Sequence, residues 1–212
     1  MEQYLVSPSP SGLTEREIEE AVVRDLESGP TGRVLIVPPD HTRLHSGAGL
    51  ITRAAYRYLS QRGSFVRVLP ALGTHEPMTE AEKQDMYAGI PADAFLVHDW
   101  RHGVTKLGEV PGSFLREITD GLWTDPIAVE LSSVLLQGWD RILSVGQVVP
   151  HEVIGMSNHA KNLFVGTGGS SMINSSHMVG AVYGMERIMG RDHTPVRRIF
   201  DYAAEQIGRA HV

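Results

Sequence analysis

Residues 33–43 read RVLIVPPDHTR, and this stretch decides the fold. Arg33–Val37 begins it with a run of aliphatic and β-branched side chains, a pattern typical of a strand buried on both faces. Two prolines end the run, and a polar segment starting at Asp40 follows. Strands covered on both faces occur mainly in parallel sheets with helices on either side, so this stretch predicts an α/β fold.

The same alternation of strand and helix patterns continues along the chain. Thr14–Glu17 and Thr79–Glu82 have the spacing of capping boxes, each of which opens a helix. We expect an α/β fold with a largely parallel central sheet flanked by helices, as a single domain over residues 13–212 after a flexible arm at 1–12. The pattern further predicts helices at 50–61, 171–189 and 195–209, strands at 66–72, 95–98, 126–131 and 141–145, and short strands or a hairpin within 103–122.

Composition excludes several classes of function. The 212 residues include no cysteine, which rules out disulfides, thiolate metal sites and thiol nucleophiles. The net charge of −6 argues against a protein that binds nucleic acid or an anionic membrane surface. The apolar runs are far shorter than the roughly 20 residues that cross a bilayer, and the N-terminal stretch lacks the pattern of a signal peptide. These features predict a cytoplasmic protein that binds a small molecule, without nucleic-acid or membrane partners.

Polar segments follow several of the predicted strands. In open α/β sheets, ligands bind beyond the carboxyl ends of the strands, so we expect these segments to meet at one rim. They are residues 39–43, 73–76, 150–152 and 158–169.

Asp40, Thr42 and Arg43 form the first candidate site. The carboxylate of Asp40 can accept hydrogen bonds from ribose hydroxyls, and the guanidinium of Arg43 can fork onto a carboxylate or a phosphate. An equally good interpretation is a turn with a local Asx-type cap and a surface ion pair.

His75 and His151 lie at predicted strand ends, next to glycine and proline. Histidine titrates near neutral pH, so two histidines at comparable positions favour acid/base chemistry. The alternative for each is a ring that only satisfies a backbone carbonyl. The six histidines interpreted as having no functional role are His41, His45, His98, His102, His193 and His211.

Lys161 precedes a glycine-rich segment, Gly166–Gly169, which is followed by a predicted helix. Glycine-rich backbone before a helix can cradle a phosphate, although a lone lysine is more often a solvated surface charge. His177 lies early in that helix, where it can reach back as a metal ligand or serve only in capping or packing.

Taken together, these residues resemble the N-terminal domain of the nickel-dependent lactate racemase family. The resemblance rests on Asp40-x-Thr42-Arg43, on Gly73-Thr74-His75, and on Pro150-His151 with Lys161 ten residues later and His177 sixteen residues after that.

The resemblance implies a Rossmann-like domain that binds a nickel-pincer nucleotide, a pyridinium mononucleotide whose two sulfur-containing arms hold nickel. It implies that Lys161 attaches the cofactor covalently and that His177 is the fourth nickel ligand. His75 and His151 would form the acid/base pair. Asp40, Thr42, Arg43 and Gly168 would help to hold the nucleotide or the substrate.

The implied activity is racemisation or epimerisation of a 2-hydroxy acid or a related hydroxyl-bearing carbon. In this family a base removes the hydroxyl proton while the Cα hydrogen moves to the cofactor as hydride, and the hydride then returns to the other face. One histidine on each face gives each enantiomer its own base, and the cofactor carries the redox step.

Two departures from the family pattern bear on function. Residues 155–161 read GMSNHAK, where the family has a stretch of the type GYSGGxK, which implies a substrate other than lactate. Family members also carry a second, C-terminal domain that closes the cleft. That domain is absent from this chain, so we expect such a domain or a homo-oligomer partner to cover the site.

The residues leave two other functions open. One is a zinc-type hydrolase that uses Asp40, His75, His151 and His177 around a metal-activated water, which gives Lys161 no role. The other is a non-catalytic module that binds a nucleotide or a sugar phosphate.

Overall fold

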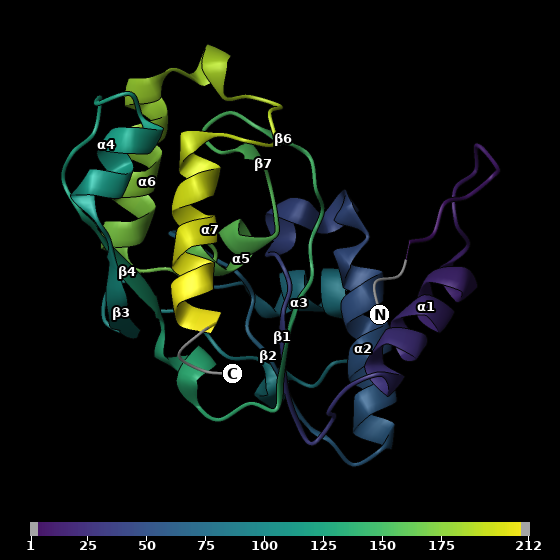
Figure 1. Cartoon of the computed structure of the whole chain (residues 1–212). Helices are drawn as coiled ribbons and strands as arrows, with labels where there is room; N and C mark the ends of the chain where they lie inside the picture. The colour runs from purple at the N-terminus through teal and green to yellow at the C-terminus, as the bar shows by residue number, and fades with distance from the viewer. Residues whose placement is uncertain (1–3, 209–212) are drawn as a thin grey trace. The chain divides into compact units, whose positions relative to one another are not determined.

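The computed structural model describes residues 4–208, with side chains described through residue 205. Figure 1 shows helices alternating with strands along the chain. The chain divides into two compact units, which we call unit 1 and unit 2. Unit 1 comprises the chain up to Pro70, Pro77–Val97 and Gln137–Val145, and unit 2 comprises Ala71–Glu76, His98–Leu136 and the chain from Gly146 onward.

Unit 1 contains the predicted parallel sheet. Strand β1 (Arg33–Val37) lies between β2 (Phe65–Val68) and β5 (Arg141–Ser144), and both pairings are parallel. The four residues from Val34 to Val37 are fully buried, which confirms the strand inferred from RVLIV. The helices of unit 1 are α1 (Glu15–Glu27), α2 (Ala48–Gln61) and α3 (Glu80–Tyr87), with 3₁₀ turns η1 (His41–Ser46) and η2 (Ala92–Ala94).

Both predicted capping boxes are present. Thr14 accepts a hydrogen bond from the backbone of Glu17, whose carboxylate accepts one from the backbone of Thr14, and Thr79 and Glu82 form the same pair. Such caps occupy helix amides that would otherwise lack a partner, and each stabilises by about 1 kcal/mol.

Unit 2 has its own core. Its strands are β3 (Val104–Val110), β4 (Ile127–Ser132), β6 (Pro150–His151) and β7 (Gly155–Met156), paired antiparallel as β3–β4 and β6–β7. Its helices are α4 (Gly112–Ile118), α5 (Ala160–Phe164), α6 (Ser170–Tyr183) and α7 (Pro195–Gly208), with 3₁₀ turns η3 (Ser133–Leu136) and η4 (Met185–Arg187). Fully buried side chains from several of these elements form one apolar cluster, among them Leu115, Ile127, Met172, Ile199 and Phe200.

Several predicted boundaries are wrong for local reasons. Strand β2 ends at Val68, two residues before Pro70, which has no amide hydrogen to donate. The predicted strand at 95–98 is reduced to an isolated bridge between Phe95 and Val68. The helix predicted to reach 189 ends at Tyr183, where Gly184 takes a positive φ of 103°.

The segment 103–122 differs most from expectation. It contains β3 and then α4, and β3 pairs with β4 beyond that helix. Pro111 stands at the N-cap of α4, and a Cβ on Gly112 would lie 2.1 Å from the carbonyl oxygen of Thr124. The proline and the close approach therefore replace the expected hairpin with a short helix.

The remaining expectations concern the ends and the domain count. Of the predicted arm at 1–12, residues 1–3 lie outside the described residues, and the rest forms no helix or strand. Residue 209 of the last predicted helix and His211 also lie outside them. No helix among residues 4–208 has the length and apolar character needed to cross a membrane. A single domain over 13–212 stays a prediction, since compact units of one chain need not fold separately.

Candidate functional site

His177 is held in the form of histidine that binds metals. Its ring is half-buried on α6, and its Nδ1 lies 2.7 Å from the carbonyl oxygen of Ile173. A carbonyl only accepts, so Nδ1 carries the hydrogen and the Nε2 lone pair is left open. Burial lowers the pKa of His177, and the positive charge of Lys161 acts in the same direction. The ring is therefore neutral at neutral pH.

His151 lies at the end of β6, and its side chain is 13% exposed. Its Nδ1 accepts a hydrogen bond from the backbone amide of Val153 at 3.2 Å. The carboxylate of Glu152 is also close, with its Oε2 3.7 Å from the same nitrogen.

Glu152 links the histidines electrostatically with Lys161. Its own backbone amide holds the pKa of the Glu152 carboxyl below its usual range, and the positive charges that Lys161 carries and that His151 and His177 carry when protonated act in the same direction. His151, Lys161 and His177 all belong to unit 2 and lie close enough to Glu152 for their charges to act on its carboxyl, while their roles at a site stay predictions. Glu152 is not among the site residues that the sequence predicts, and its place directly after a strand-end histidine is the signal that marks it.

Gly180 explains why the His151 segment can lie against α6. A Cβ on Gly180 would come within 2.6 Å of the Val153 carbonyl oxygen. Gly180 follows His177 by three residues, so both project from the same side of the helix. The missing side chain therefore lets the segment after His151 pack close to His177.

The backbone before Lys161 is strained. Asn158 and His159 both have positive φ, 63° and 53°, a region that side chains other than glycine rarely adopt. In the resembled family, glycines occupy these two positions. The backbone at Asn158 and His159 therefore adopts the positive φ that glycine favours, although neither residue is glycine. Helix α5, which contains Lys161, begins directly after this bend. The half-buried Lys161 thus projects from a backbone that is constrained.

The glycine-rich segment before α6 serves close packing. The backbone amide of Ser171 donates to the carboxylate of Glu130 at 3.1 Å, so an anion from this chain already lies at the helix N-terminus. His98 Nε2 lies 2.9 Å from the carbonyl oxygen of Gly168, and a Cβ on Gly168 would lie 2.0 Å from the Phe164 carbonyl oxygen. Cofactor binding by Gly168 stays a prediction.

His75 lies on an exposed turn of unit 2. Its amide donates to the Leu72 carbonyl at 2.9 Å, and the amide of Gly73 donates to the Gly166 carbonyl at 2.9 Å. The second bond ties the turn to the residues that follow α5, where Lys161 lies. A paired acid/base role for His75 and His151 stays a prediction.

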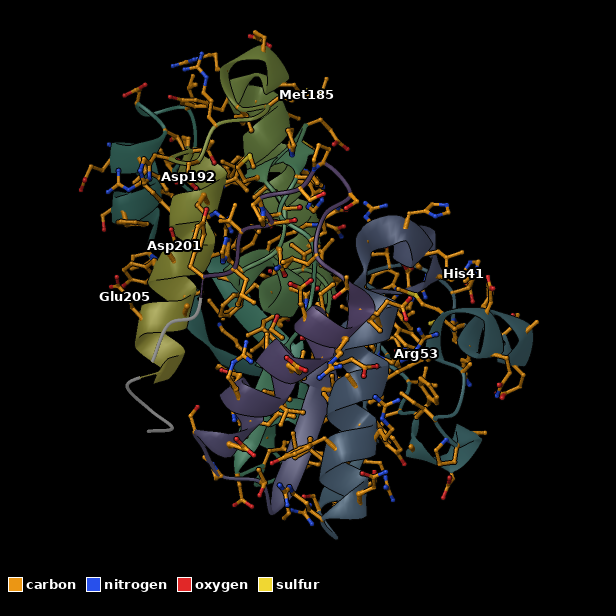
Figure 2. The ribbon with its side chains drawn as sticks, turned by 90° about the vertical axis from the view of Figure 1, so that its right-hand side faces the viewer. His41, Arg53, Met185, Asp192, Asp201 and Glu205 are labelled. Carbon is orange, nitrogen blue, oxygen red and sulfur yellow. The ribbon has the colours of Figure 1, made fainter. Side chains whose placement is uncertain are left out.

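Asp40, Thr42 and Arg43 belong to unit 1. Asp40 is 6% exposed and caps η1, accepting from the amide of Thr42 at 3.2 Å and from its hydroxyl. Arg43 is exposed, and its backbone amide donates a hydrogen bond to the carbonyl oxygen of Asp40 at 3.1 Å. His41, labelled in Figure 2, has its Nε2 2.8 Å from Asp85 Oδ2. The local cap is therefore present, and ligand binding by these residues stays a prediction.

The protein's own donors do not assemble a metal site. Within residues 4–205, no group of three or more histidine, aspartate or glutamate side chains is arranged to hold a metal ion. A zinc-type hydrolase needs about three such ligands, so this function gains no support.

Two solved structures resemble the chain. A protein from Thermotoga maritima, known from a crystal structure, superposes with a TM-score of 0.86 at 27% identity, over 97% of this chain and 50% of that one. The lactate racemase apoprotein from Thermoanaerobacterium thermosaccharolyticum superposes with a TM-score of 0.67 at 20% identity, over 89% of this chain and 46% of that one. No protein-family model and no curated protein matches.

The chain thus spans about half the length of both solved structures. The likeness to the lactate racemase apoprotein confirms the predicted fold, a mixed α/β architecture with a parallel sheet flanked by helices.

Proposed function

We propose that this chain is the part of a nickel-pincer-dependent racemase or epimerase that binds the cofactor, and that the substrate is a small molecule with a hydroxyl-bearing carbon, such as a 2-hydroxy acid. The observation that carries this proposal is the hydrogen bond from His177 Nδ1 to the Ile173 carbonyl, which leaves the Nε2 lone pair without a hydrogen, in the same unit as His151 and Lys161. The lactate racemase-like fold supports it.

The residues present suit such a cofactor. A neutral imidazole is a good ligand for Ni²⁺, and Lys161 supplies the primary amine for covalent attachment. Arg43 has a guanidinium to bind a phosphate or a carboxylate, while Asp40 and Thr42 form the turn before it. When bound, the cofactor would supply a hydride acceptor. No other part of the reaction needs redox chemistry from the chain.

The histidines handle the proton of the substrate hydroxyl. An alcohol is a weak acid, so its proton leaves readily only when a base lies within hydrogen-bond reach as the hydride departs. We assign that task to His151 for one enantiomer and to His75 for the other. The substrate is other than lactate, because Asn158 and His159 stand where the family has glycines. A second domain or subunit would exclude water from this site.

The fate of the Cα hydrogen tests this function. The cofactor-loaded chain is incubated in ordinary water with a panel of 2-hydroxy acids deuterated at Cα, and both configuration and deuterium content are followed. Hydride transfer predicts inversion with the deuterium retained. Inversion with deuterium lost to solvent would mean direct deprotonation and would contradict the proposal. A loaded chain that inverts none of the panel would show that this chain does not catalyse the reaction by itself.

A further inference from the structure

The Nδ1 atom of His151 has two competing neighbours. The amide of Val153 donates to it at 3.2 Å, which requires a bare Nδ1 and places the ring hydrogen on Nε2. Glu152 Oε2 lies 3.7 Å from the same atom and can only accept, which favours a hydrogen on Nδ1. The two neighbours therefore favour opposite tautomers of one ring.

This choice decides what His151 can do to a hydroxyl group. With the hydrogen on Nε2, that nitrogen only donates, and a neutral ring cannot take a proton there. With the hydrogen on Nδ1, Nε2 carries a lone pair in place of a hydrogen, which is the form that can accept the proton of an alcohol. A base role through Nε2 thus needs an acceptor at Nδ1, and a backbone amide cannot be one.

We propose that Glu152 is a positioning residue for His151: its carboxylate accepts a hydrogen bond from Nδ1, so that Nε2 carries no hydrogen and the ring is in the tautomer that can act as the base. The inference rests on the proposed function for its catalytic meaning. The separation of 3.7 Å would close to a hydrogen bond with a movement of about 0.5–1 Å, within the freedom of a side chain that is 61% exposed.

The surroundings are consistent with an ionised Glu152. The charged or titratable groups that act on it are His151, Lys161 and His177, all of which favour the carboxylate form. The positive charge of Lys161 attracts the same carboxylate. His177 has its Nδ1 hydrogen satisfied by Ile173 and does not need Glu152 as an acceptor.

Nitrogen NMR of the chain without cofactor tests this inference. The chain is labelled with ¹⁵N-histidine and studied at about pH 8.5, two units above the ordinary histidine pKa, where imidazole is neutral. We expect Glu152→Gln to lower the ratio of Nδ1–H to Nε2–H tautomer at His151 by about two- to fivefold, the size of an exposed charge-assisted contact. Glu152→Asp should restore part of the ratio.

Glu186→Gln is the matched control, because it removes the same charge from an exposed residue of unit 2. An unchanged His151 ratio in Glu152→Gln, or an equal change in Glu186→Gln, overturns the inference. In the loaded enzyme, Glu152→Gln should lower kcat about two- to fivefold and leave KM unchanged, and a rise in KM alone would also overturn it. A chain that takes up no cofactor would contradict the proposed function. The NMR result would still test whether Glu152 sets the tautomer of His151.

Discussion

The turn after β1 in unit 1 and the segment before α5 in unit 2 both carry candidate site residues, but they are built differently. In the turn, Asp40 is satisfied by Thr42, and His41 pairs with Asp85. In the segment before α5, Asn158 has a positive φ and a buried Oδ1 without a hydrogen-bond partner among the described residues. Local sequence explains the turn, whereas the second segment keeps a strained backbone next to Lys161.

This difference in backbone strain indicates which of the two segments is the better candidate for a functional role. Strained backbone and unpaired polar atoms persist only where the surrounding structure holds them, and they gather at functional sites. The unit 2 segment meets that description, so we expect changes there to affect the site, and changes in the turn to affect mainly stability.

The largest expected effect comes from Gly180→Ala. The new Cβ would press on the backbone at Val153, so we expect a loss of about 2–3 kcal/mol in the free energy of unfolding. Gly47→Ala is the matched change beside the unit 1 turn. Gly47 has a φ of 76° but open space around it, so we expect a loss of about 1 kcal/mol. Urea unfolding of both variants checks that Gly180→Ala loses more free energy of unfolding than Gly47→Ala. Equal losses in the two variants would contradict the packing argument.

A second test separates the two interpretations of Asp40. Asp40→Ala removes the cap of η1 and should cost about 1 kcal/mol in urea unfolding. Asp40→Asn keeps an oxygen for the Thr42 amide and should cost less than about 0.5 kcal/mol. If Asp40→Asn nonetheless lowers the uptake of cofactor, the residue also binds a ligand. Normal uptake of cofactor by Asp40→Asn would mean that Asp40 serves only as the cap of η1.

His159→Gly probes the strained segment. Glycine adopts a φ of 53° without steric cost, so we expect relief of strain to raise stability by about 0.5–1 kcal/mol, partly offset by the freer unfolded chain. His159 interacts electrostatically with Asp201, which Figure 2 labels on α7, and His159→Asn keeps a side chain while removing the imidazole. A destabilised His159→Gly together with an unchanged His159→Asn would show that backbone strain is not the dominant effect.

The smallest expected effect is a pH dependence that arises at His98. This ring is 3% exposed with Nδ1 unpaired among the described residues, and burial lowers its pKa below the ordinary value of about 6.5. The unfolded chain therefore binds the proton more readily than the folded chain. The stability that depends on a neutral His98 is complete above about pH 6.5, and it is lost as the pH falls through the lowered pKa that His98 has in the folded chain. Urea midpoints measured across this range should fall on acidification, and His98→Gln should flatten that fall.

Local signals explain what the sequence predicts well. Strand β1 follows from the four consecutive aliphatic residues Val34–Val37 before two prolines, and the helix starts follow from the threonine–glutamate pairs. The grouping of His151, Lys161 and His177 follows from their spacing together with the family resemblance.

What the sequence missed depends on contacts between distant residues. Glu130 lies 41 residues before the Ser171 amide that donates to it, so no local pattern marks it as the anion at α6. Gly168 likewise packs against the Phe164 carbonyl oxygen, and its own carbonyl oxygen lies next to His98. The contact with His98 forms only when the chain folds.

Intact mass and nickel content of the chain, co-expressed with a nickel-pincer biosynthetic set, test the central claim most directly. We predict a covalent mass increment with one nickel per chain. Lys161→Ala should lose both the increment and the metal, and His177→Ala should keep the increment but lose nickel. An unmodified mass with no nickel, in a chain shown to be folded, would contradict the assignment of Lys161 and His177.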